Sequence, residues 1–262
     1  MQLNFREQGE GEPLIILHGL FGSLDNWESI ARRLSARFRV FCVDQRNHGA
    51  SPHGSEMNFS LMAEDLREWM GEQRLQSAHV MGHSMGGKTA MQFALSFPDQ
   101  TKSLIAVDIA PRAYPPWQQY IFDALLPLDV TRFQNRRQIE DVLAGPIPDL
   151  TVRRFLLKSL THDSDGKFRW KMNLPGIFRN YPSLNAAIEG NQPFPGPVLF
   201  VRGGKSDYIC DSDVRMIRSL FPRAEIHTIP AAGHWVQAEA PDAFLEGVEN
   251  FWRRDRRAEE FL

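Results

Sequence analysis

Short, uninterrupted apolar runs constrain the fold of this 262-residue chain most strongly. Runs of this kind suit strands that are buried on both faces of a sheet, and stretches of helical length separate the first four of them. The runs lie at residues 14–17, 40–43, 78–81, 104–107 and 198–201, and the helical stretches lie at 27–37, 61–74 and 88–97. This alternation predicts an α/β fold with a mostly parallel central sheet and helices on both faces.

The alternation stops in the middle of the chain. Between residues 112 and 190 the sequence has helical pieces, scattered prolines and aromatic residues, but no convincing buried strand. It resumes with a strand at 198–201, and then come a helix at 211–220, a strand at 224–229 and a final helix from Pro241. We therefore expect a core of residues 1–111 and 191–262, and a helical cap, or lid, formed by 112–190. A longer crossover without a role at the site is the alternative. Residues 3–8 are expected to add an antiparallel edge strand.

Composition and charge argue against several classes of partner. The formal net charge of −2 gives no reason to expect nucleic acid or an anionic membrane surface. No stretch approaches the ~18 apolar residues of a membrane span, and the N-terminus carries charges where a signal peptide needs an apolar run. The two cysteines, Cys42 and Cys210, offer neither a disulfide framework nor a zinc site. We predict a cytoplasmic globular protein with no membrane or nucleic-acid partner. Its oligomeric state is not indicated.

A serine flanked by glycines lies between an expected strand and an expected helix. Residues 82–86 read Gly-His-Ser-Met-Gly, after the run at 78–81 and before the helical stretch at 88–97. A serine on a sharp strand-to-helix turn forms a nucleophile elbow, where a side chain in place of either glycine would collide with the neighbouring strand or helix. We therefore predict that Ser84 is a nucleophile.

A serine nucleophile needs a base and donors for the developing negative charge. Of the eight histidines, His234 is the best placed, because it follows the last expected strand, at 224–229, and precedes the final helix. His83, beside the nucleophile, is expected to pack or to bond to the backbone. The predicted oxyanion donors are the backbone N–H groups of Met85, directly after the nucleophile, and of Leu20, in a glycine-flanked loop after the first long strand.

The acid that orients the histidine has two candidates. Asp108 follows the run at 104–107, next to the elbow strand. The other candidate position is in the loop after the strand at 198–201. Ser206 occupies that position, and the carboxylate of Asp207 comes one residue after it. We favour Asp108, with Ser206 as an auxiliary hydrogen-bond partner, and keep Asp207 as the rival acid. The alternative role for Asp108 is to cap the start of the insertion.

Five motifs together give the chain a family resemblance. They are His-Gly-Leu-Phe-Gly-Ser-Leu-Asp-Asn-Trp at 18–27, Asp-Gln-Arg-Asn-His-Gly-Ala-Ser at 44–51, Gly-His-Ser-Met-Gly-Gly at 82–87, Val-Asp-Ile-Ala-Pro at 107–111 and Gly-His-Trp at 233–235. In these motifs the chain resembles the α/β-hydrolase family and, within it, the YbfF-type bacterial esterases. The resemblance implies the α/β-hydrolase fold, a helical cap, no cofactor and a small-molecule ester or thioester substrate. It maps Ser84, Asp108, Ser206 and His234 onto one catalytic network.

The predicted activity is therefore acyl transfer from a small ester or thioester, acyl-CoA included, to water through an acyl-enzyme. A carbon–carbon bond hydrolase or an acyl transferase with the same triad is the alternative among enzymes, and a non-catalytic ligand-binding homologue is the alternative outside them. No metal cluster, dinucleotide fingerprint or P-loop pattern competes, so neither metal nor cofactor is expected. Five aromatic residues are candidates for an apolar acyl pocket, and core packing is the equal alternative for most of them: Trp117, Phe122, Phe155, Phe178 and Trp235.

Overall fold

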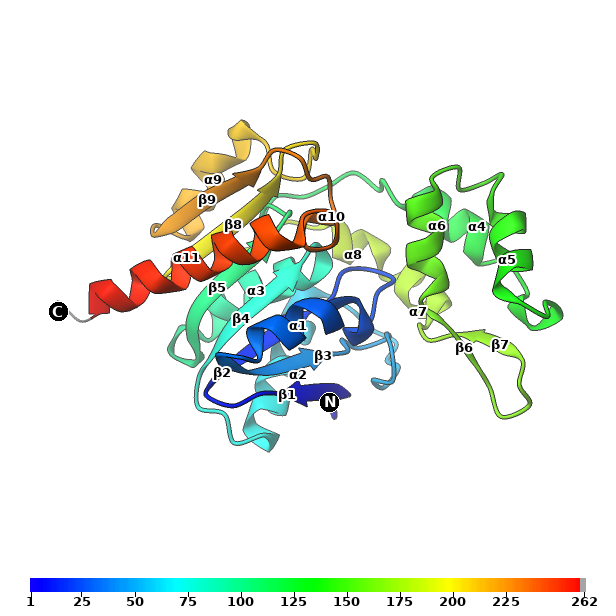
Figure 1. Ribbon diagram of the computed structural model, residues 1–262, viewed down its shortest axis with the longest axis horizontal. Helices are drawn as coiled ribbons and strands as arrows, with labels where there is room; N and C mark the ends of the chain where they lie inside the picture. The colour runs from blue at the N-terminus through cyan, green and yellow to red at the C-terminus, as the bar shows by residue number, and fades with distance from the viewer. Residues whose placement is uncertain (260–262) are drawn as a thin grey trace.

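The computed structural model describes residues 1–259 and has a seven-stranded sheet at its centre (Figure 1). The strand order is β1-β3-β2-β4-β5-β8-β9. β1 pairs antiparallel with β3, and the other neighbouring strands are parallel. The bounds are β1 Phe5–Gln8, β2 Glu12–Leu17, β3 Phe38–Val43, β4 Ala78–His83, β5 Thr101–Val107, β8 Val198–Gly203 and β9 Ala224–Ile229. The predicted fold class and the antiparallel edge strand are both observed.

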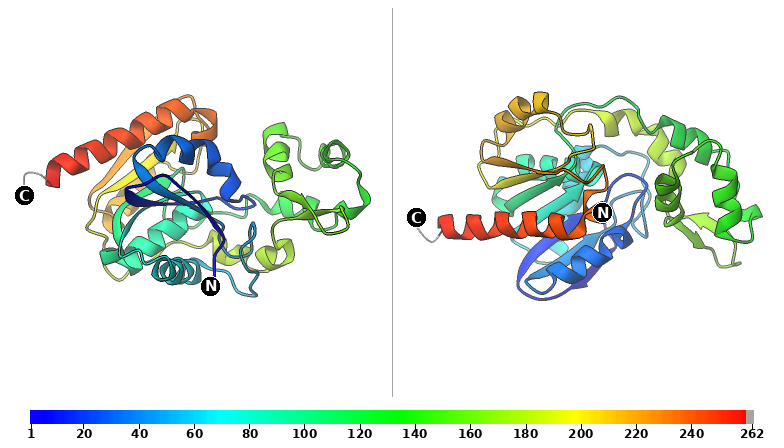
Figure 2. Two further views of the ribbon diagram at one scale, coloured as in Figure 1. Left: turned by 60° about the horizontal axis from the view of Figure 1, so that its bottom comes forward. Right: turned by 45° about the horizontal axis from the view of Figure 1, so that its top comes forward.

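Helices cover both faces of the sheet because side chains along each buried strand alternate between two apolar layers. In β2, Leu14 and Ile16 belong to one layer and Ile15 and Leu17 to the other. The first layer is closed by α1 (Glu28–Leu34) and α11 (Pro241–Glu259), and the second by α2 (Phe59–Glu72), α3 (Met85–Ser96) and α9 (Val214–Leu220) (Figure 2). This two-sided burial explains why the strands read as continuous apolar runs.

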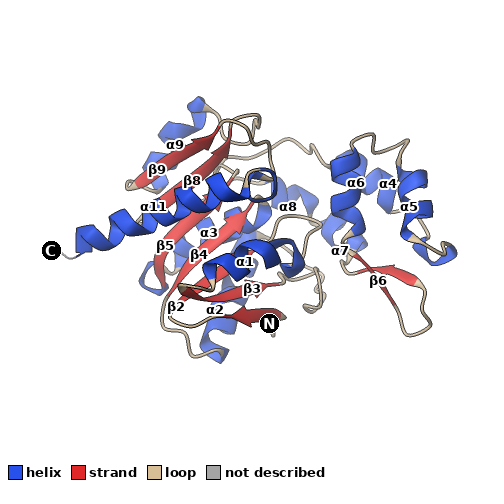
Figure 3. Cartoon of the chain, in the orientation of Figure 1, coloured by secondary structure: helices blue, strands red, loops and turns tan. Residues whose placement is uncertain are grey.

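The middle of the chain forms a separate group of elements beside the sheet (Figure 1). Its helices are α4 Gln119–Leu125, α5 Arg136–Leu143, α6 Leu150–Leu157, α7 Leu174–Arg179 and α8 Tyr181–Asn185. It also contains an antiparallel hairpin of β6 (Leu160–His162) and β7 (Phe168–Trp170), visible in Figure 3, which the sequence reading did not anticipate. The hairpin was missed because each strand has only three residues, too few to establish a periodicity. The division into a 1–111 and 191–262 core and a 112–190 cap stays a prediction.

The parallel strands bring several chain segments together at one edge of the sheet. Ser84 follows β4 and Asp108 follows β5, while residues 204–208 follow β8. His234 lies in the loop between β9 and α10 (Val236–Glu239). The carboxyl ends of neighbouring parallel strands meet at one edge, which is where sites form in open α/β sheets. Over residues 1–259, none of the helices combines the length and the apolar character that crossing a membrane requires.

Candidate active site

The backbone at Ser84 is held in a strained conformation. Its φ of 53° and ψ of −118° lie in a region that residues other than glycine rarely adopt, at the start of α3. A Cβ on Gly82 would lie 2.1 Å from the carbonyl oxygen of Gly86, and one on Gly86 would lie 2.5 Å from those of Leu17 and His18. Both positions therefore require glycine, as the elbow interpretation predicts, and the turn presents the serine at the end of β4.

Asp108 and His234 form a hydrogen-bonded pair. The Nδ1 atom of His234 donates to Oδ2 of Asp108 over 2.8 Å, and Asp108 is fully buried. The other carboxylate oxygen accepts the backbone N–H of Gly203 at 2.8 Å, and Oδ2 also accepts the hydroxyl of Ser206. Because Nδ1 carries the proton, Nε2 of the neutral imidazole is free to accept one. This arrangement matches the network expected for Asp108, Ser206 and His234.

The rival acid lies outside this network. Asp207 is exposed, and its backbone carbonyl accepts from Arg112 at 3.1 Å and from the thiol of Cys210 at 3.4 Å. Within residues 1–259, the carboxylate that is hydrogen-bonded to His234 is that of Asp108. The geometry therefore favours Asp108.

Two aromatic side chains fix the position of His234. Tyr208 stacks on the imidazole with the ring centroids 3.8 Å apart and the planes 16° apart. Nε2 of His83 donates to the carbonyl oxygen of His234 at 2.8 Å, so His83 bonds to the backbone as predicted. Burial holds the pKa of His83 well below its usual range, and the nearby His234 lowers it further. Tyr208 was missed by the sequence reading. The feature of the sequence that could have indicated it is its place two residues after Ser206, in the same loop after β8.

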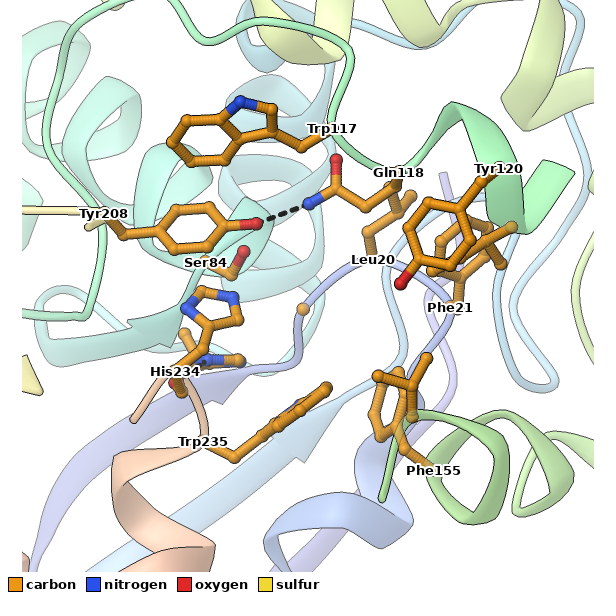
Figure 4. Close-up of a pocket in the computed structure, with 14 residues that line it drawn as sticks. Leu20, Phe21, Ser84, Trp117, Gln118, Tyr120, Phe155, Tyr208, His234 and Trp235 are labelled. Carbon is orange, nitrogen blue, oxygen red and sulfur yellow. Dashed lines mark hydrogen bonds between the residues drawn. The ribbon is translucent and has the colours of Figure 1, made fainter. Parts of the chain in front are cut away.

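The two predicted oxyanion donors flank Ser84. The N–H of Met85 belongs to the first residue of α3, so it has no intrahelical acceptor. Within residues 1–259, neither that N–H nor the N–H of Leu20 donates a hydrogen bond. No hydrogen bond joins the Ser84 hydroxyl to His234 either, although the two side chains lie next to each other in Figure 4. Such contacts commonly tighten only when substrate binds.

A cavity of about 230 Å³ opens beside the serine and the histidine (Figure 4). Of the five aromatic residues predicted for an acyl pocket, Trp117, Phe155 and Trp235 line this cavity. The other two do not line it: Phe122 is buried in the core, and Phe178 is partly exposed and packs against Phe122 with the ring centroids 5.3 Å apart. The wall residues that the sequence reading missed are Phe21, Gln118, Tyr120, Ile121, Val152 and Tyr208.

Two further motifs have structural roles. His18 is fully buried: its Nε2 accepts the N–H of Gln45 at 3.0 Å, and its Nδ1 contacts the carbonyl oxygen of Gly19 at 2.9 Å. In the 44–51 loop, Asp44 accepts the backbone N–H groups of Leu24 and Ala50 at 2.8 and 3.0 Å. Over residues 1–259, no group of three or more His, Cys, Asp or Glu side chains is placed to hold a metal ion.

Comparisons with known proteins show which family has this fold. Residues 12–241 match the family model for the alpha/beta hydrolase fold. The chain is 37% identical to the sn-1-specific diacylglycerol lipase ABHD11 of Danio rerio, over 94% of this chain and 80% of that protein. It is 36% identical to esterase YbfF of Escherichia coli K12, over 96% and 99% of the two chains. A solved structure of a marine microorganism esterase superposes with a TM-score of 0.93 at 45% identity, covering 95% of this chain and 99% of that one. The chain therefore belongs to the α/β-hydrolase fold family and is similar to its esterases and lipases.

Proposed function

We propose that this protein is a serine hydrolase that cleaves small carboxylic esters or thioesters through an acyl-enzyme. The observation that carries the proposal is the 2.8 Å hydrogen bond from His234, which lines the same cavity as strained Ser84, to the buried Asp108. Relatives named as an esterase and as a diacylglycerol lipase support an ester substrate.

The proposed reaction assigns one role to each group. Ser84 attacks the substrate carbonyl while Nε2 of His234 takes the hydroxyl proton, and Asp108 stabilises the resulting imidazolium. The N–H groups of Leu20 and Met85 bind the oxyanion. His234 then gives its proton to the leaving alcohol or thiol. A water molecule, deprotonated by the same imidazole, releases the acid and restores Ser84.

The cavity supports an apolar group on the substrate. Its wall is formed mainly by aromatic and aliphatic side chains, including Phe155, Trp235 and Trp117. We propose esters or thioesters with a short to medium apolar chain. Acyl-CoA thioesters belong to this class, and a panel of esters and thioesters of increasing acyl length compares them directly. The cytoplasmic location is likewise a proposal, which cell fractionation tests.

Active-site labelling tests the proposal. A fluorophosphonate should add covalently to Ser84 in the intact protein, as shown by peptide mass spectrometry, and Ser84→Ala should abolish both labelling and p-nitrophenyl acetate hydrolysis. A folded wild-type protein that neither labels nor hydrolyses the ester would instead support a non-catalytic, ligand-binding role.

Acyl transfer to an alcohol is a second candidate. It is favoured by the similarity to a probable alcohol acetyltransferase of Saccharomyces cerevisiae, 31% identical over 92% of this chain and 77% of that protein. The same acyl-enzyme serves both reactions, so the outcome depends on whether water or an alcohol reaches it. Product analysis with p-nitrophenyl acetate and added ethanol or hexanol distinguishes them: a transferase gives mainly the new ester, and a hydrolase gives acetate.

A further inference from the structure

Lys88 is a buried cation one helical turn after Ser84. Only 1% of it is exposed, and its backbone N–H donates to the carbonyl oxygen of Ser84 at 3.0 Å. Its ammonium group donates to the carbonyl oxygen of Arg112 at 2.8 Å and to that of Ala186. Among the described residues, no carboxylate forms an ion pair with it. The ammonium is therefore bound by backbone carbonyls. Burying a charge without an opposite charge beside it costs desolvation free energy.

The two carbonyls belong to the two ends of the segment that runs from residue 112 to residue 190. These ends lie side by side: the N–H of Tyr114 donates to the carbonyl of Asn185 at 2.8 Å, and that of Ile188 donates to Pro111 at 2.7 Å. The ammonium of Lys88 also lies 4.8 Å from the ring centroid of Tyr114. Lys88 thus joins both ends of the segment to the helix that begins at the nucleophile.

The wall of the cavity continues directly from these ends. The hydroxyl of Tyr114 accepts the N–H of Ala110 at 2.8 Å and donates to the carbonyl of Tyr208, whose ring stacks on His234. A few residues further on, the side-chain amide of Gln118 donates to the Tyr208 hydroxyl at 2.5 Å. A shift of the segment ends therefore moves the cavity wall and the ring that contacts the base.

We propose that Lys88 is a positioning residue, whose ammonium group clamps both ends of the 112–190 segment to α3 and thereby sets the shape of the substrate cavity. The inference rests on the proposed hydrolase function. An apolar side chain of similar length would fill the same space without burying a charge, but it would leave two carbonyl oxygens without this donor. The charge is thus explained by the two contacts that it makes.

The clamp weakens when the ammonium loses its proton. Burial and, to a smaller extent, the nearby Arg112 together lower the pKa of Lys88 to about 7. The charged and titratable groups that face Lys88 are Arg112, which pairs with Asp213 at 3.0 Å, and Tyr114, whose pKa is raised by burial. Below pH 7 the ammonium makes charge-assisted hydrogen bonds, and above it the neutral amine makes weaker ones.

Substrate size separates a positioning role from a general structural one. Lys88→Met removes the donor, Lys88→Arg keeps a charge, and Lys167→Met, at an exposed position in the β6–β7 hairpin, is the control. Lys88→Met should lower kcat/KM for p-nitrophenyl hexanoate by a factor at least ten times larger than for p-nitrophenyl acetate. The difference should come mainly from a higher KM for the hexanoate. Lys88→Arg should recover part of the loss, and the control should keep the wild-type ratio. Equal losses with the two esters, or none, would overturn the proposal.

Hydrogen exchange of the wild-type protein keeps the test decisive if Lys88→Met does not fold. After correction for intrinsic exchange rates, the amides of Tyr114 and Ile188 should lose protection between pH 6 and pH 9 relative to the amides of β4. Unchanged protection at both ends refutes the clamp. Failure of the proposed function has a different signature, since the wild-type protein would then resist the fluorophosphonate.

Discussion

Replacing Asp108 by Asn tests the assignment of the acid with a change of one atom. The carboxylate accepts from Gly203, Ser206 and His234, so it acts purely as an acceptor. The side-chain oxygen of Asn still accepts the N–H of Gly203, but the NH₂ group then faces Nδ1 of His234 and can only donate. The imidazole must accept that bond, which moves its proton to Nε2, where it blocks removal of the proton of Ser84.

The expected loss follows from this change of tautomer. The same substitution in trypsin-type proteases costs about 10⁴-fold in kcat, so we expect Asp108→Asn to lose roughly 10³–10⁴-fold. At about 1.4 kcal/mol per factor of ten, this is about 4–5.5 kcal/mol of transition-state stabilisation. Asp207→Asn should lose less than about threefold, because the exposed side chain is outside the network.

Steady-state hydrolysis of p-nitrophenyl acetate measures both variants, and thermal melting confirms that each is folded. Ser206→Ala removes one of the three donors and should lose at least about tenfold, since a hydrogen bond to a charged group contributes roughly 1.5–3 kcal/mol. A loss of several orders of magnitude in Asp207→Asn, with Asp108→Asn nearly active, would refute the assignment.

Three further predictions concern the elbow, acid stability and the cavity. Gly82→Ala should lose more than about 3 kcal/mol in urea unfolding because its Cβ meets a backbone oxygen at 2.1 Å, whereas Gly145→Ala, with nothing within 4 Å, should unfold like wild type. Burial lowers the pKa of His18, His48 and His83, so near and below pH 6.5 the unfolded state binds more protons than the folded state. The free energy of unfolding should therefore fall from pH 7.5 to pH 5.5, with roughly 1 kcal/mol of the loss from His48, whose pKa is lowered to about 3. Equal stability at the two pH values contradicts this. Phe155→Ala should raise KM for p-nitrophenyl hexanoate about tenfold and for the acetate far less, with exposed Leu126→Ala, outside the cavity, as the unaffected control.

The centre of the sheet could be predicted because β2, β3, β4, β5 and β8 are buried on both faces, which the sequence shows as continuous apolar runs. Ser84, His234 and Asp108 could be placed because each follows a strand, and the ends of parallel strands share one edge. The choice between Asp108 and Asp207 needed the structure, since only the path of the loop after β8 shows that Asp207 is exposed while Asp108 is hydrogen-bonded to His234.

The middle of the chain was far less predictable. Tyr120 lines the cavity and Phe122 is buried, although both belong to α4 and both are aromatic. Their roles depend on how α4 is rotated against its neighbours, and short helices with irregular connections leave that rotation undetermined in the sequence. The role of Lys88 was hidden for a related reason, because its partners are backbone carbonyls, which no residue type reveals.

The hydrogen bond from His83 to the carbonyl of His234 separates two ways in which the site can fail. In the proposed mechanism, Asp108 sets the tautomer of the imidazole, whereas His83, the residue before Ser84, anchors the main chain that carries it. Loss of the carboxylate therefore leaves the ring in its place but incorrectly protonated. Loss of the His83 contact leaves the ring correctly protonated but no longer held at a fixed distance from Ser84. The first defect concerns the protonation of the imidazole and the second its position, so either one could be corrected by substitutions that leave the other unchanged.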